Sequence, residues 1–222
     1  MKQIIGFVPM RCGSKGIPMK NIKNLCGKPL CYYVLNALMK SKKIDLIYVS
    51  TDCNEIENIV NGFSFNKVIV IKRSKKNASD YASSESAIIE FIKSHSINPS
   101  SIIFFTQVTS PLLTHKDVDG GIELFNDKKN DTVLSAVKFN RFFWSDNGVP
   151  LNYDPLNRPT RQKMKDFYVE NGAFYISKVK DIVKHKTRIS GRIGIFPMHE
   201  DSLIEIDELN DFIQMEKIIE NR

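Results

Sequence analysis

Short runs of apolar and β-branched residues recur along the chain, a pattern typical of buried strands. The runs are IIGFV at 4–8, IDLIYVS at 44–50, KVIVI at 67–71, SIIFFTQ at 101–107, TVLSAVK at 132–138, NGAFYI at 171–176 and RIGIFP at 192–197. Most are separated by segments long enough to hold a helix. The pattern therefore predicts seven strands.

Helical periodicity fills three of the intervals and also follows the last strand, with apolar residues repeating every three or four positions. These stripes are Leu30, Val34, Ala37 and Leu38; Ala87, Ile88, Phe91, Ile92 and His95; Val118, Ile122 and Phe125; and Leu209, Phe212, Ile213 and Ile219. Strand and helix alternate through at least five rounds. This order predicts an α/β fold with a mostly parallel, doubly wound, Rossmann-like sheet covered by helices on both faces.

The stretch from 139 to about 170 interrupts this alternation. It holds Trp144, the turn Asn147-Gly148, three prolines and the basic cluster NRPTRQKMK. Irregular segments of this length inside a compact domain are usually functional loops or interaction arms. We therefore expect one domain spanning 1–222, with an arm at 139–170.

Composition narrows the function classes. A chain of 222 residues that is 42% hydrophobic can bury one full core. The formal charge of +7 favours an anionic partner. The basic residues are spread along the chain, so a small anionic substrate fits as well as nucleic acid does. The aromatic and basic stretch KFNRFFW motivates a nucleic-acid-binding alternative, but no RNA-binding signature or basic block supports it.

Cysteine usage and hydropathy indicate the compartment. The four cysteines are Cys12, Cys26, Cys31 and Cys53. Their spacing does not match a zinc site, and we interpret them as reduced thiols of a cytosolic protein. The first residues hold no apolar leader pattern, and about 18 apolar residues never occur in succession. We expect a cytoplasmic protein that does not insert into a membrane.

The segment RCGSKGIPMKN, which follows the first strand, carries the strongest chemical signal. Gly13 and Gly16 lack side chains where backbone amides would approach an anion, and Arg11, Lys15 and Lys20 add positive charge. The spacing is neither that of a Walker A loop nor GxGxxG. The interpretation is a phosphate-binding loop, with a solvated basic turn as the alternative. Ligands bind at the carboxyl ends of parallel strands, where the polar segments STD, KRS and TQVTSP also fall.

Six segments in chain order resemble one known family. They are VPMRCGSKGIPMKNIKNLCGKPL at 8–30, STD at 50–52, RSKKNASDYASSES at 73–86, TQVTSPLLT at 106–114, YVENGAFYI at 168–176 and SLIEIDELNDF at 202–212. Together they resemble the acylneuraminate cytidylyltransferases (CMP-sialic acid synthetases), including CMP-legionaminate-type synthetases. Met10, Cys12 and Val108 depart from the family pattern conservatively, whereas Glu205 stands where an aspartate is usual.

The resemblance implies a nucleotide-diphospho-sugar transferase fold and a transfer reaction. The anomeric hydroxyl of a nine-carbon 2-keto sugar acid would attack the α-phosphate of CTP, releasing pyrophosphate and forming a CMP-sugar. Mg²⁺ or Mn²⁺ would serve as cofactor. The family also implies a homodimer, to which the arm and a second segment at 185–200 near Phe196 would contribute.

Residue roles carried over from the family fall into three groups. The nucleotide group is Arg11, Gly13, Ser14, Lys15, Gly16, Lys20, Asn21, Arg73 and Ser84, and the catalytic group is Arg11, Lys20 and Asp207. The sugar group is Gln107, Arg161, Gln162, Tyr168 and Asn171. An arginine suits the sugar carboxylate, but Arg158, Lys163 and Lys165 compete with Arg161 for that role.

Two carboxylates are candidates for the metal. Glu205 and Asp207 alternate across IEID, so a strand would point both to one face, about 7 Å apart. Such hard oxygen ligands suit Mg²⁺. Asp207 would also fit as the N-cap of the next helix, Ser84 as the N-cap of another, and Asp211 as a solvated side chain.

The sequence leaves the sugar open. Legionaminate, pseudaminate, deaminated sialic acid or an eight-carbon acid remain alternatives, as does a catalytically silent homologue in view of Glu205. A non-catalytic nucleotide- or nucleic-acid-binding protein is the alternative from a different class.

Overall fold

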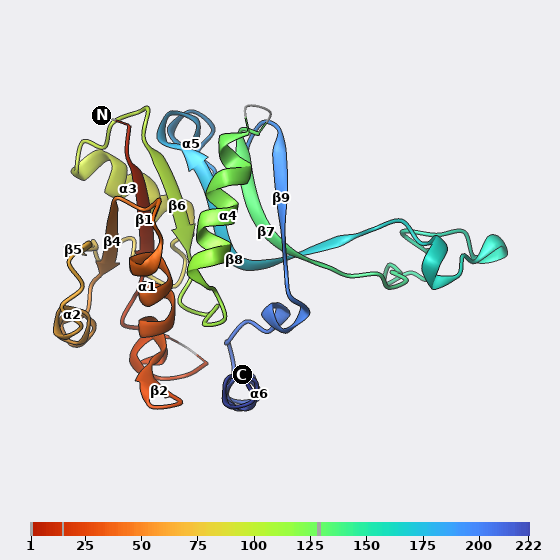
Figure 1. The fold of residues 1–222 in the computed structure, drawn as a ribbon, viewed down its shortest axis with the longest axis horizontal. Coiled ribbons are helices and arrows are strands. Elements are labelled where there is room, and N and C mark those ends of the chain that lie inside the picture. Colours follow the sequence, from red (N-terminus) through yellow and green to blue (C-terminus); the bar gives the residue numbers. More distant parts are fainter. Residues whose placement is uncertain (1, 15, 128–129) are drawn as a thin grey trace.

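The computed structural model describes residues 2–14, 16–127 and 130–222, except for the side chain of Arg161. Within these residues the chain forms a seven-stranded sheet in the order β5-β4-β1-β6-β8-β7-β9 (Figure 1). The strands are β1 (Ile4–Pro9), β4 (Leu46–Thr51), β5 (Val68–Lys72), β6 (Ile102–Thr106), β7 (Thr132–Lys138), β8 (Tyr168–Lys178) and β9 (Ile193–Met198). Only β8 runs antiparallel to its neighbours β6 and β7. The seven predicted strands and the mostly parallel sheet are confirmed.

Four of the helices were predicted by their apolar stripes. These are α1 (Leu30–Lys40), α3 (Ser84–Ser94), α4 (His115–Asn126) and α6 (Leu209–Glu220). The sequence analysis missed α2 (Asn54–Gly62) and α5 (Val179–His185), together with the small hairpin of β2 (Asn24–Leu25) and β3 (Lys28–Pro29). Short 3₁₀ turns occur at η1 (Lys20–Ile22), η2 (Pro155–Asn157), η3 (Arg161–Lys163) and η4 (Glu200–Leu203). In the part of the chain that the structure describes, no helix combines the length and hydropathy needed to span a bilayer.

Side-chain alternation along the central strands builds two cores, one on each face of the sheet. In β6, Phe104 packs into the core formed with α1, α2, α4 and α6, whereas Phe105 packs into the core formed with α3 and α5. Phe7 on β1 stacks on Phe91 of α3 at 4.8 Å between ring centroids. Because both faces are covered, the doubly wound architecture is confirmed.

Side-chain caps fix the starts of α3 and α6. Ser83 caps α3, since its hydroxyl accepts a hydrogen bond from the Ser86 amide at 3.1 Å. Glu208 is the N-cap of α6, in a capping box with Asp211. Caps at Ser84 and Asp207, and a merely solvated Asp211, are therefore ruled out. The cap of α3 lies one residue before the predicted Ser84, and the cap of α6 lies one residue after the predicted Asp207.

Between β7 and β8 the chain leaves the body and forms a long arm, residues 139–167 (Figure 1). Its rings pack locally, with Phe142 and Tyr153 at 4.3 Å between centroids. At its base, Lys138 and Asp166 form an ion pair at 2.6 Å. The predicted irregular stretch is thus an arm, although its last residues belong to β8.

Candidate active site

A cavity of about 470 Å³ opens where the parallel strands end. Its walls come from the segments after β1, β5 and β6 and from the segment before α6. The residues that line it include Arg11, Ser14, Gly16, Lys20, Asn21, Arg73, Asp80, Ala82, Ser84, Gln107, Val108, Thr109, Asp207 and Glu208. The position agrees with the rule that ligands bind at the carboxyl ends of parallel strands.

The loop after β1 is anchored at several points of its main chain and side chains. Arg11 Nη1 lies 2.5 Å from Asp80 Oδ1, an ion pair that joins this loop to the segment before α3. Buried Asn21 donates its amide to the Arg11 carbonyl at 2.9 Å. The Cys12 amide donates to Asp52 Oδ1 at 2.9 Å. The arginine is therefore held in the cavity wall before any ligand binds.

The two loop glycines have different surroundings. A Cβ on Gly16 would lie 2.2 Å from the Asp207 carbonyl oxygen, whereas a Cβ on Gly13 would meet nothing within 4 Å. The lack of a side chain at Gly16 therefore allows the loop to touch the segment before α6. This role of the glycine was not predicted from the sequence. Gly13 faces open space but does not line the cavity. Lys15 lies outside the described residues.

Lys20 joins the loop to the C-terminal segment. Its Nζ donates to the Ile206 carbonyl at 2.6 Å and to Asp207 Oδ1 at 2.9 Å. The side chain is only 14% exposed, so water screens this pair weakly on the lysine side. One cation thus lies among oxygen atoms from the segment that was predicted to bind metal.

The segment holding Glu205 and Asp207 is not a strand, contrary to the prediction from IEID. It follows η4, and no described strand pairs with it; its Ile206 amide bonds to the Thr109 carbonyl at 3.4 Å instead. The segment nevertheless keeps an alternation of buried and exposed side chains, because Ile206 is fully buried in the core while Asp207 is exposed.

Glu205 is half-buried, and its carboxylate lies against the glycine of NGAFYI. Burial raises the pKa of Glu205, nearby Asp207 raises it further, and Lys20 opposes both. Gly172 has φ +65, and a Cβ there would lie 2.0 Å from Glu205 Oε1. Gly172 is therefore required both for its backbone conformation and for the space it leaves.

Arg73 follows β5 directly and lines the cavity as a half-buried side chain. Burial lowers the pKa of its guanidinium, which the carboxylates of Asp52 and Glu90 partly offset. Its Nε is buried and has no hydrogen-bond partner among the described residues. That buried atom does not open on the cavity, but Arg73 and Ser84 both line it and carry other donors, so they mark a place for a hydrogen-bonding ligand.

The sugar group divides between the cavity and other places. Gln107 lines the cavity. Asn171 is buried, and its amide donates to the Ser202 hydroxyl at 2.8 Å, so it supports η4 and does not line the cavity. Gln162 lines a hollow on the arm with Lys138 and Arg141.

Tyr168 lines a third hollow, beside Ile193 and Ile195 of β9. The side chain of Arg161 lies outside the described part of the structure. Phe196, in the segment expected at a dimer interface, packs inward against Phe174 at 5.5 Å between ring centroids. Within one chain, the structure thus does not bring Gln162 or Tyr168 to the cavity.

Several cavity residues were not singled out from the sequence. Asp80, Thr109 and Glu208 line the cavity, and Gly172 makes room for Glu205. Each lies inside one of the six resembling segments. The resemblance could have identified these residues. Local sequence patterns could not, because the partners of these residues become neighbours only in the fold.

The charges of the cavity are balanced and preorganised. Arg11 pairs with Asp80, Lys20 pairs with Asp207, and Arg73 lines the same cavity. Cations held at the strand ends of an open α/β sheet can bind a polyanion such as a nucleotide. The class of protein that fold and cavity define is thus an α/β protein with a nucleotide-type site.

Sequence comparison identifies the family. The family model described as "Cytidylyltransferase" matches residues 5–222, so the chain belongs to the cytidylyltransferase family. It is 32% identical to N-acylneuraminate cytidylyltransferase A of Danio rerio over 213 residues, covering 93% of this chain and 48% of the relative. The N-acylneuraminate cytidylyltransferase of Oncorhynchus mykiss is 37% identical over 183 residues, covering 79% of this chain and 41% of the relative. The chain spans about half the length of these curated relatives.

Solved structures share the fold at low identity. One is a CMP:2-keto-3-deoxy-manno-octonic acid synthetase complexed with CTP, with a TM-score of 0.72 and 14% identity over 99% of both chains. Another is the 4-diphosphocytidyl-2C-methyl-D-erythritol synthase of Anaerococcus prevotii, with a TM-score of 0.71 and 15% identity over 99% of this chain and 96% of that one. Both likenesses concern the fold.

Proposed function

We propose that the protein is a cytidylyltransferase that activates a nine-carbon 2-keto sugar acid, N-acetylneuraminate or a close relative, with CTP. The products are the CMP-sugar and pyrophosphate. The observation that carries the proposal is the convergence of Arg11, Lys20 and Arg73 on one cavity at the strand ends. The names of the relatives supply the substrate class.

Arg11 and Lys20 are assigned to the triphosphate of CTP. Their present partners, Asp80 and Asp207, are carboxylates that a phosphate can replace with little movement of either cation. Backbone amides near Ser14 and Gly16 add uncharged donors. Because the bond between Pα and its bridging oxygen to Pβ breaks as the sugar oxygen attacks Pα, cations held in place stabilise the charge that develops on pyrophosphate.

Arg73 and Ser84 are assigned to the cytosine base. Cytosine presents a ring carbonyl and a ring nitrogen as acceptors, and both residues carry donors in the cavity wall. Because Arg73 is half-buried, water competes weakly for a hydrogen bond to its guanidinium.

Glu205 and Asp207 are assigned to Mg²⁺ or Mn²⁺. The donor set fits, because hard oxygen ligands suit Mg²⁺: the Ile206 carbonyl and Asp207 already accept hydrogen bonds from the Lys20 ammonium, and the charges of Asp207 and Lys20 both act on the nearby Glu205 carboxylate. A bound divalent ion would neutralise charge on the triphosphate. Gly172 leaves room for the Glu205 carboxylate. None of the described residues that line the cavity is a histidine, so carboxylates are the bases at hand there.

The sugar acid requires more contacts than Gln107 alone provides, and we assign these to the arm of a second copy in a homodimer. Exposed apolar residues on the arm support this assignment: Trp144 is 50% exposed and Leu156 is 98% exposed. Gln162 and Tyr168 lie along the same arm and its base. We further assign one cytidylyltransferase domain to 1–222 and the reaction to the cytoplasm, in keeping with four free cysteines.

Pyrophosphate release tests the activity. The purified chain is incubated with Mg²⁺, one nucleoside triphosphate at a time and a panel of eight- and nine-carbon sugar acids. We expect release only with CTP and a nine-carbon acid, lost in Arg11→Ala and kept in Lys28→Ala, whose side chain is on the β2–β3 hairpin. Failure of the protein to bind CTP would overturn the assignment of the cavity.

Mixing two variants tests the arm. Lys20→Ala disables the cavity and Gln162→Ala the arm, so each is expected to be inactive alone. If the arm serves the partner's cavity, an equal mixture regains about a quarter of wild-type turnover, because half the dimers are mixed and each holds one intact site. An active Gln162→Ala variant, or a mixture without recovery, would contradict this arrangement.

A further inference from the structure

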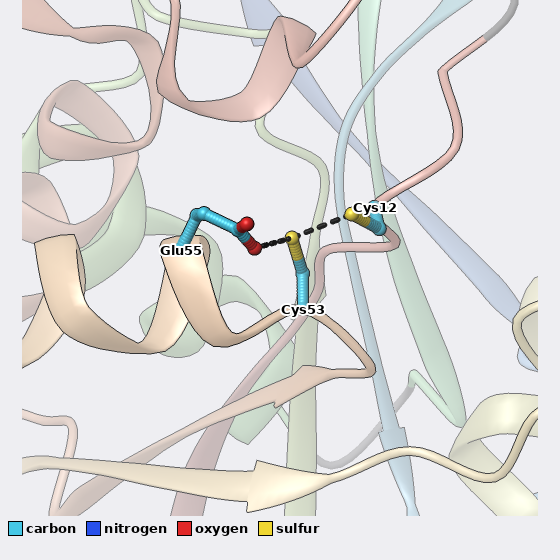
Figure 2. Close-up of side chains that lie close together, drawn as sticks. All are labelled: Cys12, Cys53 and Glu55. Carbon is cyan, nitrogen blue, oxygen red and sulfur yellow. Dashed lines mark hydrogen bonds between the residues drawn. The ribbon is translucent and has the colours of Figure 1, made fainter.

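Two cysteine thiols meet where the loop after β1 passes the start of α2 (Figure 2). Cys12 follows Arg11 in the loop, and Cys53 is the N-cap residue of α2. Their sulfur atoms lie 2.6 Å apart. Glu55, in the first turn of the helix, points at the same place, with its Oε2 3.2 Å from the Cys53 sulfur.

We propose that Cys12 and Cys53 form a reversible disulfide when the protein meets a hydroperoxide, which ties the loop carrying Arg11 to the start of α2. The proposal concerns a modification site and stands apart from the substrate assigned above.

The main chain holds both cysteines in place. The Cys12 amide donates to Asp52 Oδ1 at 2.9 Å, and the Cys53 amide donates to Thr51 Oγ1 at 3.1 Å. The pairing of β1 with β4 brings the two strand ends together, with Pro9 opposite Ser50. Because the anchors are the last residue of β4 and the residue that follows it, the two cysteines remain neighbours in the folded protein.

The distance between the sulfur atoms favours a covalent bond over a shared metal ion. A disulfide bond is about 2.05 Å long. Two thiolates on a tetrahedral zinc ion lie about 3.8 Å apart, because each Zn–S bond is about 2.3 Å. The observed 2.6 Å is much nearer the disulfide value. The group of Cys12, Cys53 and Glu55 has ligand atoms that would suit a metal, but the sulfur atoms would have to move apart to hold one.

The two thiols differ in a way that sets the order of the reaction. Cys12 is partly exposed, whereas Cys53 is 2% exposed. Burial raises the pKa of Cys53 to about 12, so it remains a thiol at neutral pH. An oxidant from solvent therefore reacts first with Cys12, and Cys53 acts second.

The chemistry balances with a hydroperoxide as the oxidant. The Cys12 sulfur attacks the O–O bond, which gives a sulfenic acid on Cys12 and releases an alcohol or water. The Cys53 sulfur then attacks the Cys12 sulfur, the S–O bond breaks, and the oxygen leaves as water. Glu55 accepts the Cys53 proton along the existing hydrogen bond and passes it to solvent. In sum, two thiols and one hydroperoxide give one disulfide, one alcohol and one water.

Intact mass and thiol counts test the site without any enzymatic readout. Treating the full chain with hydrogen peroxide should remove two of its four thiols and about 2 Da, and dithiothreitol should restore both. Peptide mapping should show a Cys12–Cys53 link. Cys12→Ser and Cys53→Ser should each abolish the change. Cys26→Ser and Cys31→Ser are the matched controls and should retain it, because Cys26 hydrogen-bonds at 3.7 Å to Glu216 in α6 and Cys31 is buried in α1.

Three further results would overturn the proposal or part of it. A link to another cysteine, or stable oxygen adducts on Cys12 without a link, would overturn the disulfide. Stoichiometric Zn²⁺ binding that both serine variants lose and that blocks oxidation would make the pair a metal site instead. Thirdly, Glu55→Gln should slow the link at least tenfold, without slowing sulfenic acid formation; an unchanged rate would remove Glu55 from the mechanism.

Thermal unfolding measures how much the Cys12–Cys53 disulfide stabilises the folded protein. A link between residues 12 and 53 closes a long loop in the unfolded chain, so the oxidised wild type should melt about 5–15 °C above the reduced protein. Peroxide-treated Cys53→Ser should show no rise. A mapped link with an unchanged or lower melting temperature would show that the disulfide distorts this region, contrary to the proposal.

Discussion

The cavity is stabilised by contacts between distant parts of the sequence, whereas the arm is stabilised by local contacts. In the cavity, Arg11 pairs with Asp80 and Lys20 with Asp207, across 69 and 187 residues of sequence. In the arm the contacts are local: Arg158 lies 4.0 Å from the Phe142 ring, and Asp166 pairs with Lys138 at the base. The fold as a whole thus determines the cavity, whereas the arm is organised by its own residues.

This difference matches the roles that we propose for the two regions, catalysis for the cavity and dimer contacts for the arm. Cations in the cavity are positioned by a rigid sheet, so they can be removed without unfolding it. Exposed apolar residues of the arm stabilise little within one chain, and in the proposed homodimer they would contact the partner. The predictions below test the two regions separately.

Lys20→Ala should give the largest effect. It removes a cation that is held 2.9 Å from Asp207, and turnover should fall about 10²–10³-fold, the range expected for losing one preorganised charged donor. Melting temperature and circular dichroism should stay close to wild type. Lys28→Ala is the control of equal charge change outside the cavity, and equal losses in both variants would refute a local role for Lys20.

Asp207→Asn should come next in size. The variant keeps the shape of the side chain and loses its negative charge, so the Mg²⁺ concentration for half-maximal turnover should rise about tenfold. A Mg²⁺ titration of pyrophosphate release measures it. Glu220→Gln, at the exposed end of α6, removes the same charge elsewhere. A wild-type titration curve for Asp207→Asn would remove the metal assignment.

Gly172→Ala should act mainly through stability. The added Cβ would collide with Glu205 Oε1, and φ +65 disfavours any side chain. We expect a loss of about 1–3 kcal/mol in the free energy of unfolding, measured by urea denaturation. Gly62→Ala is the matched control, because a Cβ there meets nothing within 4 Å. A stable Gly172→Ala variant would mean that Glu205 can move away freely.

The strands and most helices could be predicted because their signal is local. Each strand is an apolar, β-branched run, and α1, α3, α4 and α6 carry wide stripes. In α2 only Ile56 and Val60 of nine residues are buried, between asparagines and glutamates, so its stripe is too thin to detect. The direction of β8 was not predictable, because it depends on the arm returning the chain beside β7.

The site was predictable as far as its motifs follow strands. Arg11, Lys20, Arg73 and Gln107 all line the cavity. Contacts between distant segments were not predictable: Gly16 touches Asp207, and Gly172 leaves room for Glu205. The choice between Ser83 and Ser84 as helix cap turns on one residue, which the pattern of consecutive serines cannot decide.

The smallest predicted effect concerns the base of the arm and its response to pH. The hydrogen bond from Lys138, a second from Asn140 and the Lys138 charge lower the pKa of Asp166 below its ordinary value of 3.8. Because the pKa of Asp166 is lower in the folded state, its ionised carboxylate stabilises the base of the arm fully at pH values above the ordinary pKa of 3.8. This stabilisation is lost as the pH falls through the folded-state pKa.

Amide exchange at Phe139 would detect that loss, because this amide donates to the Phe167 carbonyl at 2.8 Å and closes the base of the arm. Corrected for intrinsic rates, its protection should fall in acid for the wild type and be lower but independent of pH in Asp166→Asn. Asp154→Asn, further out on the arm, should behave as wild type. Since the pair is solvent-exposed, the melting temperature of the sheet should hardly change. A global loss of stability in Asp166→Asn would show that the arm and the body are coupled more tightly than their local contacts indicate.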